Sequence, residues 1–160
     1  MKLIMEIRKI EESDYHLLKE FIYWAIFTPK GSELPERDII NNPDVSIYVD
    51  NFGQKDDCGI IAEIDGKAIG AAWTRIIPAY GHIDDETPEL AISVLPEYRN
   101  QGIGVRLMEK LFELLKECGY KRTSLAVQKE NPAVKFYHRL GYETISQNDE
   151  EYIMVKNLNT

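Results

Sequence analysis

The sequence predicts an α/β (α+β) domain in which helices flank one mixed β-sheet of about six to seven strands. Short apolar runs of strand length alternate along the chain with longer stretches of helical periodicity. Asp65-Gly66 separates two apolar runs, as in a two-residue β-hairpin. Two glycines, Gly102 and Gly104, join another apolar run to a strongly periodic helix. With 160 residues and no linker or repeat, we expect a single domain spanning 1–160.

The strands are expected where apolar residues alternate or form short continuous runs. These runs are residues 3–10, 58–64, 67–76, 90–95, 123–127, 143–146 and 152–156. The run 90–95 is mostly apolar, which is typical of a strand buried on both faces. The run 123–127 follows the glycine segment and its helix as another short strand.

The helices are expected from apolar spacing and from capping residues at their ends. They are residues 13–25, 35–40, 44–51, 104–118 and 131–140. Ser13 and Asn131 are predicted N-caps, and Gly119 and Gly141 follow the last two helices as stop signals. Residues 44–51 also fit a strand because their apolar residues alternate, but a helix is favoured.

Composition excludes several classes of function. The formal net charge is -8 with a pI near 4.9, which argues against a nucleic-acid binder and against attachment to an anionic membrane. The charged N-terminus is unlike a secretory signal, and no apolar stretch is long enough to span a bilayer, so we expect a cytoplasmic protein. Cys58 and Cys118 lack metal-ligand spacing and are expected to be small buried residues, and no metal is expected.

The glycine segment is the first candidate site. It reads Arg99-Asn100-Gln101-Gly102-Ile103-Gly104 in the stretch VLPEYRNQGIGVRLMEKLFELL. Glycines before a helix N-terminus let an anion approach unpaired backbone N–H groups, so a phosphate site is expected. A P-loop is excluded because no Lys-Ser or Lys-Thr pair follows. A Rossmann fingerprint is incomplete because Leu107 stands where its third glycine belongs.

Two segments carry a family resemblance. ELAISVLPEYRNQGIGVRLMEKLFELL and SLAVQKENPAVKFYHRLGYE resemble the GNAT superfamily of N-acetyltransferases, and the likeness extends over about residues 7–156. The resemblance implies transfer of an acetyl group from acetyl-coenzyme A to a primary amine of a small molecule or peptide, directly in a ternary complex. It also implies a GNAT-like fold, no metal, and a possible homodimer.

The resemblance implies which residues hold the cofactor. The glycine segment would wrap the pyrophosphate, the strand before it would bind the pantetheine arm and polarise the thioester carbonyl through its backbone, and a helix cap would contact the same arm. The corresponding residues are Ile92, Ser93, Val94, Arg99, Asn100, Gln101, Gly102, Ile103, Gly104 and Asn131. Ile92 and Val94 are equally expected in the core of the sheet, and Asn131 is first of all a helix cap.

Two further residues correspond to catalytic groups of the family. Tyr137 matches the tyrosine that protonates the leaving sulfur, although it also fits an apolar helical stripe and could simply pack. Glu89, at the start of the strand before the glycine segment, is the predicted base. The alternatives are that Glu89 is an exposed strand-end residue and that ordered water removes the proton.

The acceptor side is predicted from aromatic residues and an acidic loop. Trp24, Phe27, Trp73 and Tyr80, with the acidic run 84–86, would form a pocket for a cationic amine. The alternative is that both tryptophans lie in the core and the acidic run is a solvated loop. A non-catalytic acyl-coenzyme A sensor is the alternative function, since it would need the glycine segment but neither Tyr137 nor Glu89.

Overall fold

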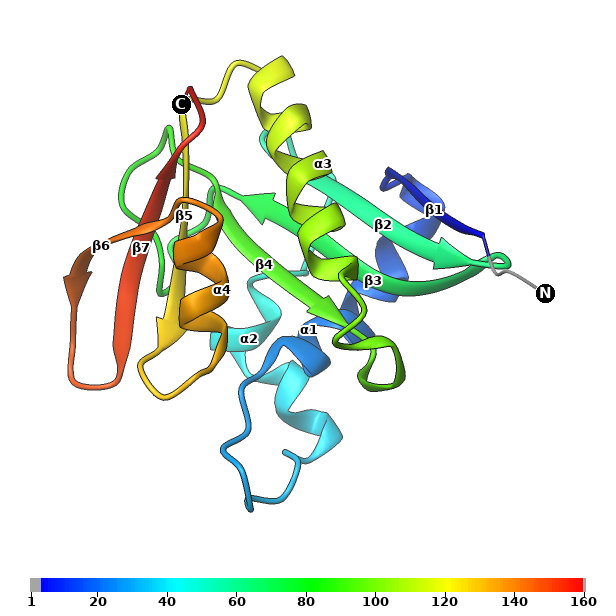
Figure 1. Cartoon of the computed structure of the whole chain (residues 1–160), viewed down its shortest axis with the longest axis horizontal. Coiled ribbons are helices and arrows are strands. Elements are labelled where there is room, and N and C mark those ends of the chain that lie inside the picture. Colours follow the sequence, from blue (N-terminus) through cyan, green and yellow to red (C-terminus); the bar gives the residue numbers. More distant parts are fainter. Residues whose placement is uncertain (1–3, 160) are drawn as a thin grey trace.

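The computed structural model describes residues 4–159, which form a seven-stranded mixed sheet (Figure 1). The strand order across the sheet is β1-β2-β3-β4-β5-β7-β6. The strands are β1 (Met5–Lys9), β2 (Cys58–Ile64), β3 (Lys67–Arg75), β4 (Glu89–Val94), β5 (Arg122–Gln128), β6 (Glu143–Gln147) and β7 (Glu151–Asn157). Neighbouring strands are antiparallel except β4 and β5, which are parallel. The predicted fold class is therefore confirmed.

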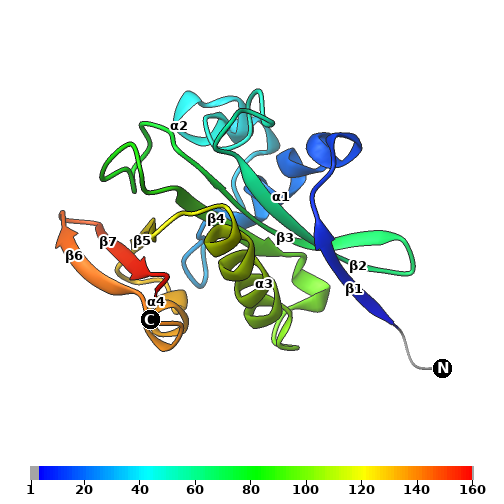
Figure 2. The ribbon, with the colours of Figure 1, turned by 90° about the horizontal axis from the view of Figure 1, so that it is seen from above.

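Helices cover both faces of the sheet. They are η1 (Glu12–Leu17), α1 (Leu18–Ala25), η2 (Arg37–Asn41), α2 (Pro43–Ser46), η3 (Pro96–Tyr98), α3 (Ile103–Glu117) and α4 (Ala133–Arg139), where η marks a 3₁₀ helix. Figure 2 shows α3 and α4 on one face and α1 and α2 on the other. Within residues 4–159, no helix combines the length and the apolar character needed to cross a membrane.

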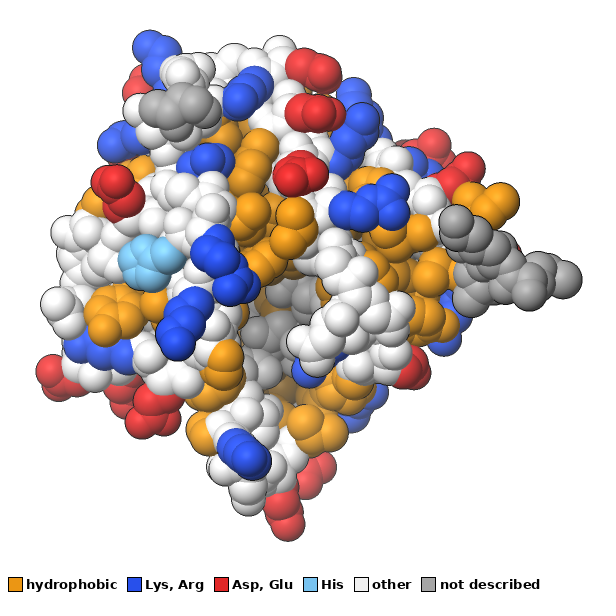
Figure 3. Space-filling model, viewed as in Figure 1, with side chains coloured by type: hydrophobic (Ala, Val, Ile, Leu, Met, Phe, Trp, Pro, Cys, Tyr) orange, Lys and Arg blue, Asp and Glu red, His pale blue; other side chains and the backbone are white. Residues whose placement is uncertain are grey.

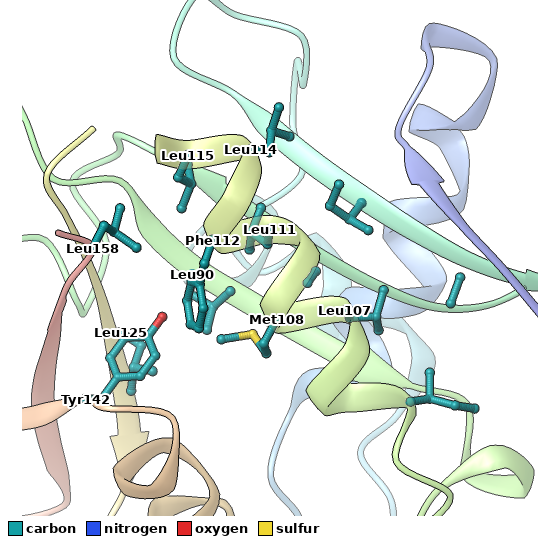
Figure 4. Close-up of a cluster of buried hydrophobic side chains, with 14 of the residues drawn as sticks. Leu90, Leu107, Met108, Leu111, Phe112, Leu114, Leu115, Leu125, Tyr142 and Leu158 are labelled. Carbon is teal, nitrogen blue, oxygen red and sulfur yellow. The ribbon is translucent and has the colours of Figure 1, made fainter. Parts of the chain in front are cut away.

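The sheet separates two hydrophobic cores. Successive strand residues point to opposite faces, so Ile60 belongs to the core under α3 and Ile61 to the core under α1. The predicted apolar stripe of α3 is confirmed for Leu107, Met108, Leu111, Leu114 and Leu115, which are buried, but not for Cys118 at its end, which is exposed. Figure 4 shows this α3-side core, where the helix packs over Leu90 of β4.

The predicted hairpin is confirmed in detail. β2 and β3 pair antiparallel up to Ile64 and Lys67. Asp65 and Gly66, which connect them, have φ angles of 51° and 79°. Both residues therefore adopt the left-handed conformation that a tight two-residue hairpin loop requires, and glycine adopts it without a steric cost.

Three local predictions need correction. Ser13 does not cap an α-helix, because it lies inside η1, where Asp14 accepts the N–H of Glu11 at 2.8 Å. The helix predicted at 44–51 is only α2, Pro43–Ser46, followed by turns. The two cysteines, predicted to be buried, are not: Cys58 is half-buried and Cys118 is exposed. Cys118 is exposed because it follows the last residue of α3 at the helix end.

The parallel strands β4 and β5 separate soon after they begin. Their pairing register within residues 4–159 contains one residue pair, Glu89 with Ser124. Ser124 fastens this end, because its N–H donates to the carbonyl of Pro88 at 3.0 Å and its hydroxyl donates to the carbonyl of Gly81 at 2.7 Å. Beyond this point β4 continues to pair only with β3. The two strands therefore form a wedge that opens towards their carboxyl ends.

Candidate functional site

A cleft of about 930 Å³ lies at the open end of this wedge. Its walls are the end of β4, the first turn of α3, the start of α4, and α1 with the segment that follows it. The lining residues are 23–32, 34, 35, 92–94, 98–100, 102–105, 131–133, 136, 137 and 139. Figure 3 shows the molecular surface hollowed at the same place. Segments far apart in the sequence therefore meet around one concave site.

The glycine segment forms the wall of the cleft at the N-terminus of α3. Gly102 is the N-cap residue with φ 79°, and no side chain caps the helix. Asn100 also has a positive φ of 62°. The first N–H groups of a helix have no partner within it and form the positive end of its dipole. An uncapped α3 that begins in the cleft therefore presents these groups to an anion.

The two glycines serve different purposes. A Cβ atom built on Gly102 would meet no other atom within 4 Å, so this position borders open space, and within the chain itself it is the backbone angle that favours glycine. A Cβ atom on Gly104 would lie 3.3 Å from Cζ of Phe136. Gly104 therefore allows α3 and α4 to approach closely across the cleft.

Arg99 lines the cleft, whereas Gln101 does not. Arg99 lines it, and its guanidinium donates to the carbonyls of Val94 at 3.0 Å and Trp24 at 3.2 Å. It therefore ties the end of β4 to the end of α1. Gln101 is exposed and does not line the cleft, and its amide donates to the carbonyl of Glu97 at 3.5 Å. Of the six residues predicted in the segment, Gln101 is the one that lies outside the cleft wall.

The end of β4 contributes backbone as well as side chains. Ile92, Ser93 and Val94 all line the cleft. The hydroxyl of Ser93 donates to the carbonyl of Phe21 at 2.6 Å, which fixes α1 against the strand. Ile92 and Val94 also pack against the α3-side core. Because β5 has diverged here, the edge of β4 that faces the wedge is not covered by a neighbouring strand.

Tyr137 and Asn131 come to the cleft from α4 and the turn before it. The ring of Tyr137 packs edge-on against Phe136 and Tyr142 at centroid distances of 5.5 Å and 5.8 Å. Burial raises the pKa of Tyr137 to about 12, because the phenolate would lose its hydration. The N-cap residue of α4 is Pro132, one residue after the predicted Asn131, whose side chain accepts the N–H of Ala133 at 2.9 Å.

The predicted acceptor residues fall into two groups. Trp24 and Phe27 line the cleft, whereas Trp73 and Tyr80 do not. Trp73 is 1% exposed, and its indole N–H donates to the carbonyl of Tyr48 at 2.8 Å. Tyr80 is exposed, and its hydroxyl donates to Asp44 at 3.0 Å. This corrects the predicted aromatic wall, because the pleat of β3 turns Trp73 into the core under α1.

The acidic part of the predicted pocket also lies elsewhere. Residues 84–86 do not line the cleft. Asp84 instead accepts a hydrogen bond from the guanidinium of Arg122 at 2.6 Å, and both side chains are partly exposed. The acidic run is therefore a partly solvated loop, which was the alternative interpretation of the sequence.

Glu89 is buried at the closed end of the wedge. Its side chain is not an exposed strand-end group, because the residue is only 2% exposed. Its Oε2 accepts the N–H of Gly81 at 2.9 Å and the hydroxyl of Tyr48. Its Oε1 has no hydrogen-bond partner within residues 4–159. Burial is the main cause that raises the pKa of Glu89, and the hydrogen bond from Tyr48 opposes it.

Glu89 and the cleft lie on the same strand but at different places. Glu89 stands three residues before Ile92, or about 10 Å along an extended strand, and it does not line the cleft. Tyr48 is the contact that sequence reasoning missed. It lies in the turns after α2, and no periodicity indicates that a residue there reaches Glu89.

The family of the chain follows from comparison with known proteins. The model of the Acetyltransferase (GNAT) family matches residues 17–142, a span that contains every wall of the cleft. The chain belongs to the GNAT family of acetyltransferases. This confirms the resemblance predicted from the glycine segment and the α4 region, and with it the predicted class of enzyme.

Individual proteins similar to this chain are also acetyltransferases. An uncharacterized N-acetyltransferase of Archaeoglobus fulgidus is 32% identical over 142 residues, which cover 83% of this GNAT chain and 89% of the relative. The PaiA N-acetyltransferase of Thermoplasma acidophilum, solved with coenzyme A, has a TM-score of 0.68 and 21% identity, covering 96% of this chain and 99% of that one. The structure of yncA from Salmonella typhimurium with its cofactor acetyl-coenzyme A has a TM-score of 0.68 and 16% identity, covering 98% and 95%. The two solved structures establish the shared fold.

Proposed function

We propose that this protein transfers the acetyl group of acetyl-coenzyme A to a primary amine of a small molecule or peptide, by direct attack in a ternary complex in the cytoplasm. One observation carries the proposal. In a GNAT family member, the open wedge between β4 and β5 leads into the uncapped N-terminus of α3 within a single cleft. A long anionic cofactor with a linear arm fits this combination of an anion site and a free strand edge.

The cofactor would lie across the residues that the sequence indicated. The N–H groups from Gly102 to Val105 suit the pyrophosphate, because charge-assisted hydrogen bonds to backbone donors are strong. The pantetheine arm would pair with the free edge of β4 at residues 92–94 and pass Asn131. Coenzyme A and acetyl-coenzyme A in the solved PaiA and yncA structures support this assignment.

The acetyl group would move in one displacement. The neutral amine attacks the thioester carbonyl carbon, the carbon–sulfur bond breaks, and coenzyme A leaves as a thiolate. The sulfur then takes a proton from the hydroxyl of Tyr137. The attacking nitrogen loses its second proton to become the amide, and transfer of a proton through solvent restores the phenol. Because burial raises the pKa of Tyr137 to about 12, the hydroxyl keeps its proton at neutral pH and can donate a hydrogen bond to the sulfur.

The acceptor arrives as an ammonium ion and must lose a proton before it can attack. Glu89 is the proposed base, acting through water because it lies about 10 Å along β4 from Ile92. Burial raises its pKa and therefore makes it a stronger base than an ordinary carboxylate. Tyr48 and Gly81 hold one carboxylate oxygen, which leaves Oε1 to take the proton.

The test is a thiol-release assay with acetyl-coenzyme A and a panel of primary amines, run on the wild-type protein and on Tyr137→Phe. We expect amine-dependent release of thiol and an acetylated product of matching mass. Tyr137→Phe should lower kcat by roughly 10²–10⁴ with little change in cofactor affinity. Tyr152→Phe, a half-buried tyrosine outside the cleft, is the matched control and should keep its rate.

Two outcomes would contradict parts of this proposal. Tight binding of acetyl-coenzyme A without release in any amine mixture would favour the sensor function instead. Unchanged kcat in Tyr137→Phe would reduce Tyr137 to a packing residue. A homodimer, implied by the family resemblance, stays a prediction.

A further inference from the structure

The charge of the cleft is opposite to that of the chain. The protein carries a net charge of -8. The charged residues that line the cleft within residues 4–159 are Lys30, Arg99 and Arg139, and no Asp or Glu is among them. Glu33 belongs to the segment after α1 but does not line the cleft. A cationic ligand would therefore meet cationic side chains in a cleft without a compensating carboxylate.

The aromatic wall of the cleft is already occupied by guanidinium groups. Cζ of Arg37 lies 4.1 Å from the ring centroid of Tyr23 and 5.4 Å from that of Trp24. Arg37 is held there by Glu20, with an N–O distance of 2.6 Å. Cζ of Arg99 lies 6.0 Å from the ring of Trp24 as well. These rings therefore have little capacity left for a cation–π contact with a ligand.

The segment between α1 and η2 offers one cation beside apolar surface. Lys30 is exposed, lines the cleft, and has no ion-pair or hydrogen-bond partner within the described residues. Phe27 and Leu34, from the same segment of the chain, also line the cleft, and Leu34 is 59% exposed. The hydroxyl of Tyr23 donates to the carbonyl of Pro35 at 2.6 Å, which fastens the far end of this segment to α1. Figure 1 shows the segment at the bottom of the view, away from α3.

We propose that the acceptor is an amine that carries its own carboxylate on an apolar body, such as an apolar α-amino acid. Its carboxylate would pair with Lys30 and its apolar side chain would pack on Phe27 and Leu34. Polyamines and other polycations would be poor acceptors. This inference rests on the proposed acetyl transfer and names the class of acceptor. It also corrects the expectation, drawn from the acidic loop, that the pocket suits a cationic amine.

The experiment compares amines that differ only in the carboxylate. The pairs are phenylalanine with phenethylamine and leucine with isopentylamine, and spermidine represents the polycations. We expect kcat/KM to be about tenfold higher for the amino acid of each pair, which is the range of a partly desolvated ion pair. Lys30→Ala should remove this preference. Lys19→Ala, an exposed lysine of α1 outside the cleft, should retain it.

The outcomes separate this inference from the proposed function. Amine-dependent transfer that favours spermidine would overturn the carboxylate preference and leave acetyl transfer intact. A rise in KM for acetyl-coenzyme A in Lys30→Ala, with the amine preference unchanged, would also overturn it, because Lys30 would then serve the cofactor.

If no amine is acetylated, the proposed transfer fails and a binding measurement decides the inference. Calorimetry on the protein loaded with coenzyme A would compare N-acetylphenylalanine with N-acetylphenethylamine. Tighter binding of the acid, lost in Lys30→Ala, supports the carboxylate site. Equal binding of the two compounds, or binding of neither, overturns it.

Discussion

Glu89 is buried and Tyr137 is half-buried in the cleft wall, and loss of hydration of the charged form raises the pKa of each. The consequences differ. With a pKa raised to about 12, the hydroxyl of Tyr137 is protonated at neutral pH and remains a hydrogen-bond donor. Glu89 becomes protonated at a higher pH than an ordinary carboxyl group does. The proposed acid is therefore always ready at neutral pH, whereas the proposed base is lost on acidification.

The pH profile of kcat/KM should show this base. Activity should rise with pH through the raised pKa of Glu89, above the ordinary value of 4.5, and Glu89→Gln should remove that limb. The hydrogen bond from Tyr48 lowers the pKa of Glu89, so Tyr48→Phe should move the limb to higher pH. The control is Tyr80→Phe, because the hydroxyl of Tyr80 contacts Asp44 and not Glu89. This variant should leave the acidic limb of the profile unchanged. If the limb of Tyr48→Phe lies at the same pH as that of the wild type, Glu89 is not the base.

The free energy of unfolding should also depend on pH through Glu89. The folded protein holds the proton of Glu89 more tightly than the unfolded chain does. The contribution of Glu89 to the free energy of unfolding is therefore largest at low pH. It falls as pH rises from the ordinary carboxyl pKa through the raised one. Glu89→Gln should abolish this contribution, which a series of urea unfolding curves across that window would measure.

At the scale of elements, the turn into α3 combines a backbone requirement with a ligand requirement. Gly102 can be compared with Gly66 of the β2–β3 hairpin, because both have φ 79° and a Cβ atom on either would meet nothing within 4 Å. Valine at either position should cost about 1–2 kcal/mol of stability through the left-handed backbone. Their contributions to folding are therefore matched, whereas only Gly102 lies beside the uncapped helix.

We expect Gly102→Val to lose coenzyme A affinity by at least about tenfold, since its side chain would fill the space that an anion needs. Gly66→Val should bind coenzyme A normally. Calorimetric titration of both variants, with urea unfolding to verify equal stability, makes the comparison. Equal coenzyme A affinity in the two variants would contradict an anion site at the N-terminus of α3.

At the scale of the whole molecule, a buried ion pair joins β3 to the segment that carries Tyr48. Nε of Arg75 lies 3.0 Å from Oδ1 of Asp57, and the two side chains are 6% and 4% exposed. The same guanidinium donates to the carbonyls of Ile47 at 2.9 Å and Asp50 at 2.7 Å. Arg75 therefore fixes the turns after α2 against the sheet, and these turns bring Tyr48 to Glu89.

Removal of one partner should be costly. Asp57→Ala leaves the Arg75 guanidinium buried without its carboxylate, and we expect a loss of about 3–5 kcal/mol in the free energy of unfolding. Glu113→Ala, which breaks the exposed pair with Lys110, should cost about 0–1 kcal/mol. Urea unfolding of both variants measures the difference. Similar losses in the two variants would contradict the role assigned to the buried pair.

Features that depend on near neighbours in the chain could be predicted from the sequence. Asp65-Gly66 predicted the hairpin because both residues tolerate positive φ angles. The apolar spacing of α3 predicted which of its faces is buried. The glycine segment predicted an open helix N-terminus and, through its resemblance, the family that comparison confirmed. Eleven of the residues predicted to contact cofactor or acceptor line the cleft, and they are Trp24, Phe27, Ile92, Ser93, Val94, Arg99, Asn100, Gly102, Ile103, Gly104 and Asn131.

Features that depend on distant segments were decided by the tertiary structure. An aromatic residue looks the same in sequence whether it lines a cleft or a core, so Trp24 and Trp73 could not be told apart. The pleat of β3 and the packing of α1 separate them. The burial of Glu89 and its contact with Tyr48 require three segments to meet.

The sequence by itself determined the order of strands and helices and the glycine turn into α3, because these depend on local periodicity and backbone freedom. Its resemblance to known proteins indicated the acetyltransferase family. Only the tertiary structure decided the wedge between β4 and β5, the environment of Glu89 and the cationic lining of the cleft. The physical reason is that burial and charge at a site are sums over side chains contributed by segments far apart in the chain. Their proximity is set by packing and not by sequence spacing.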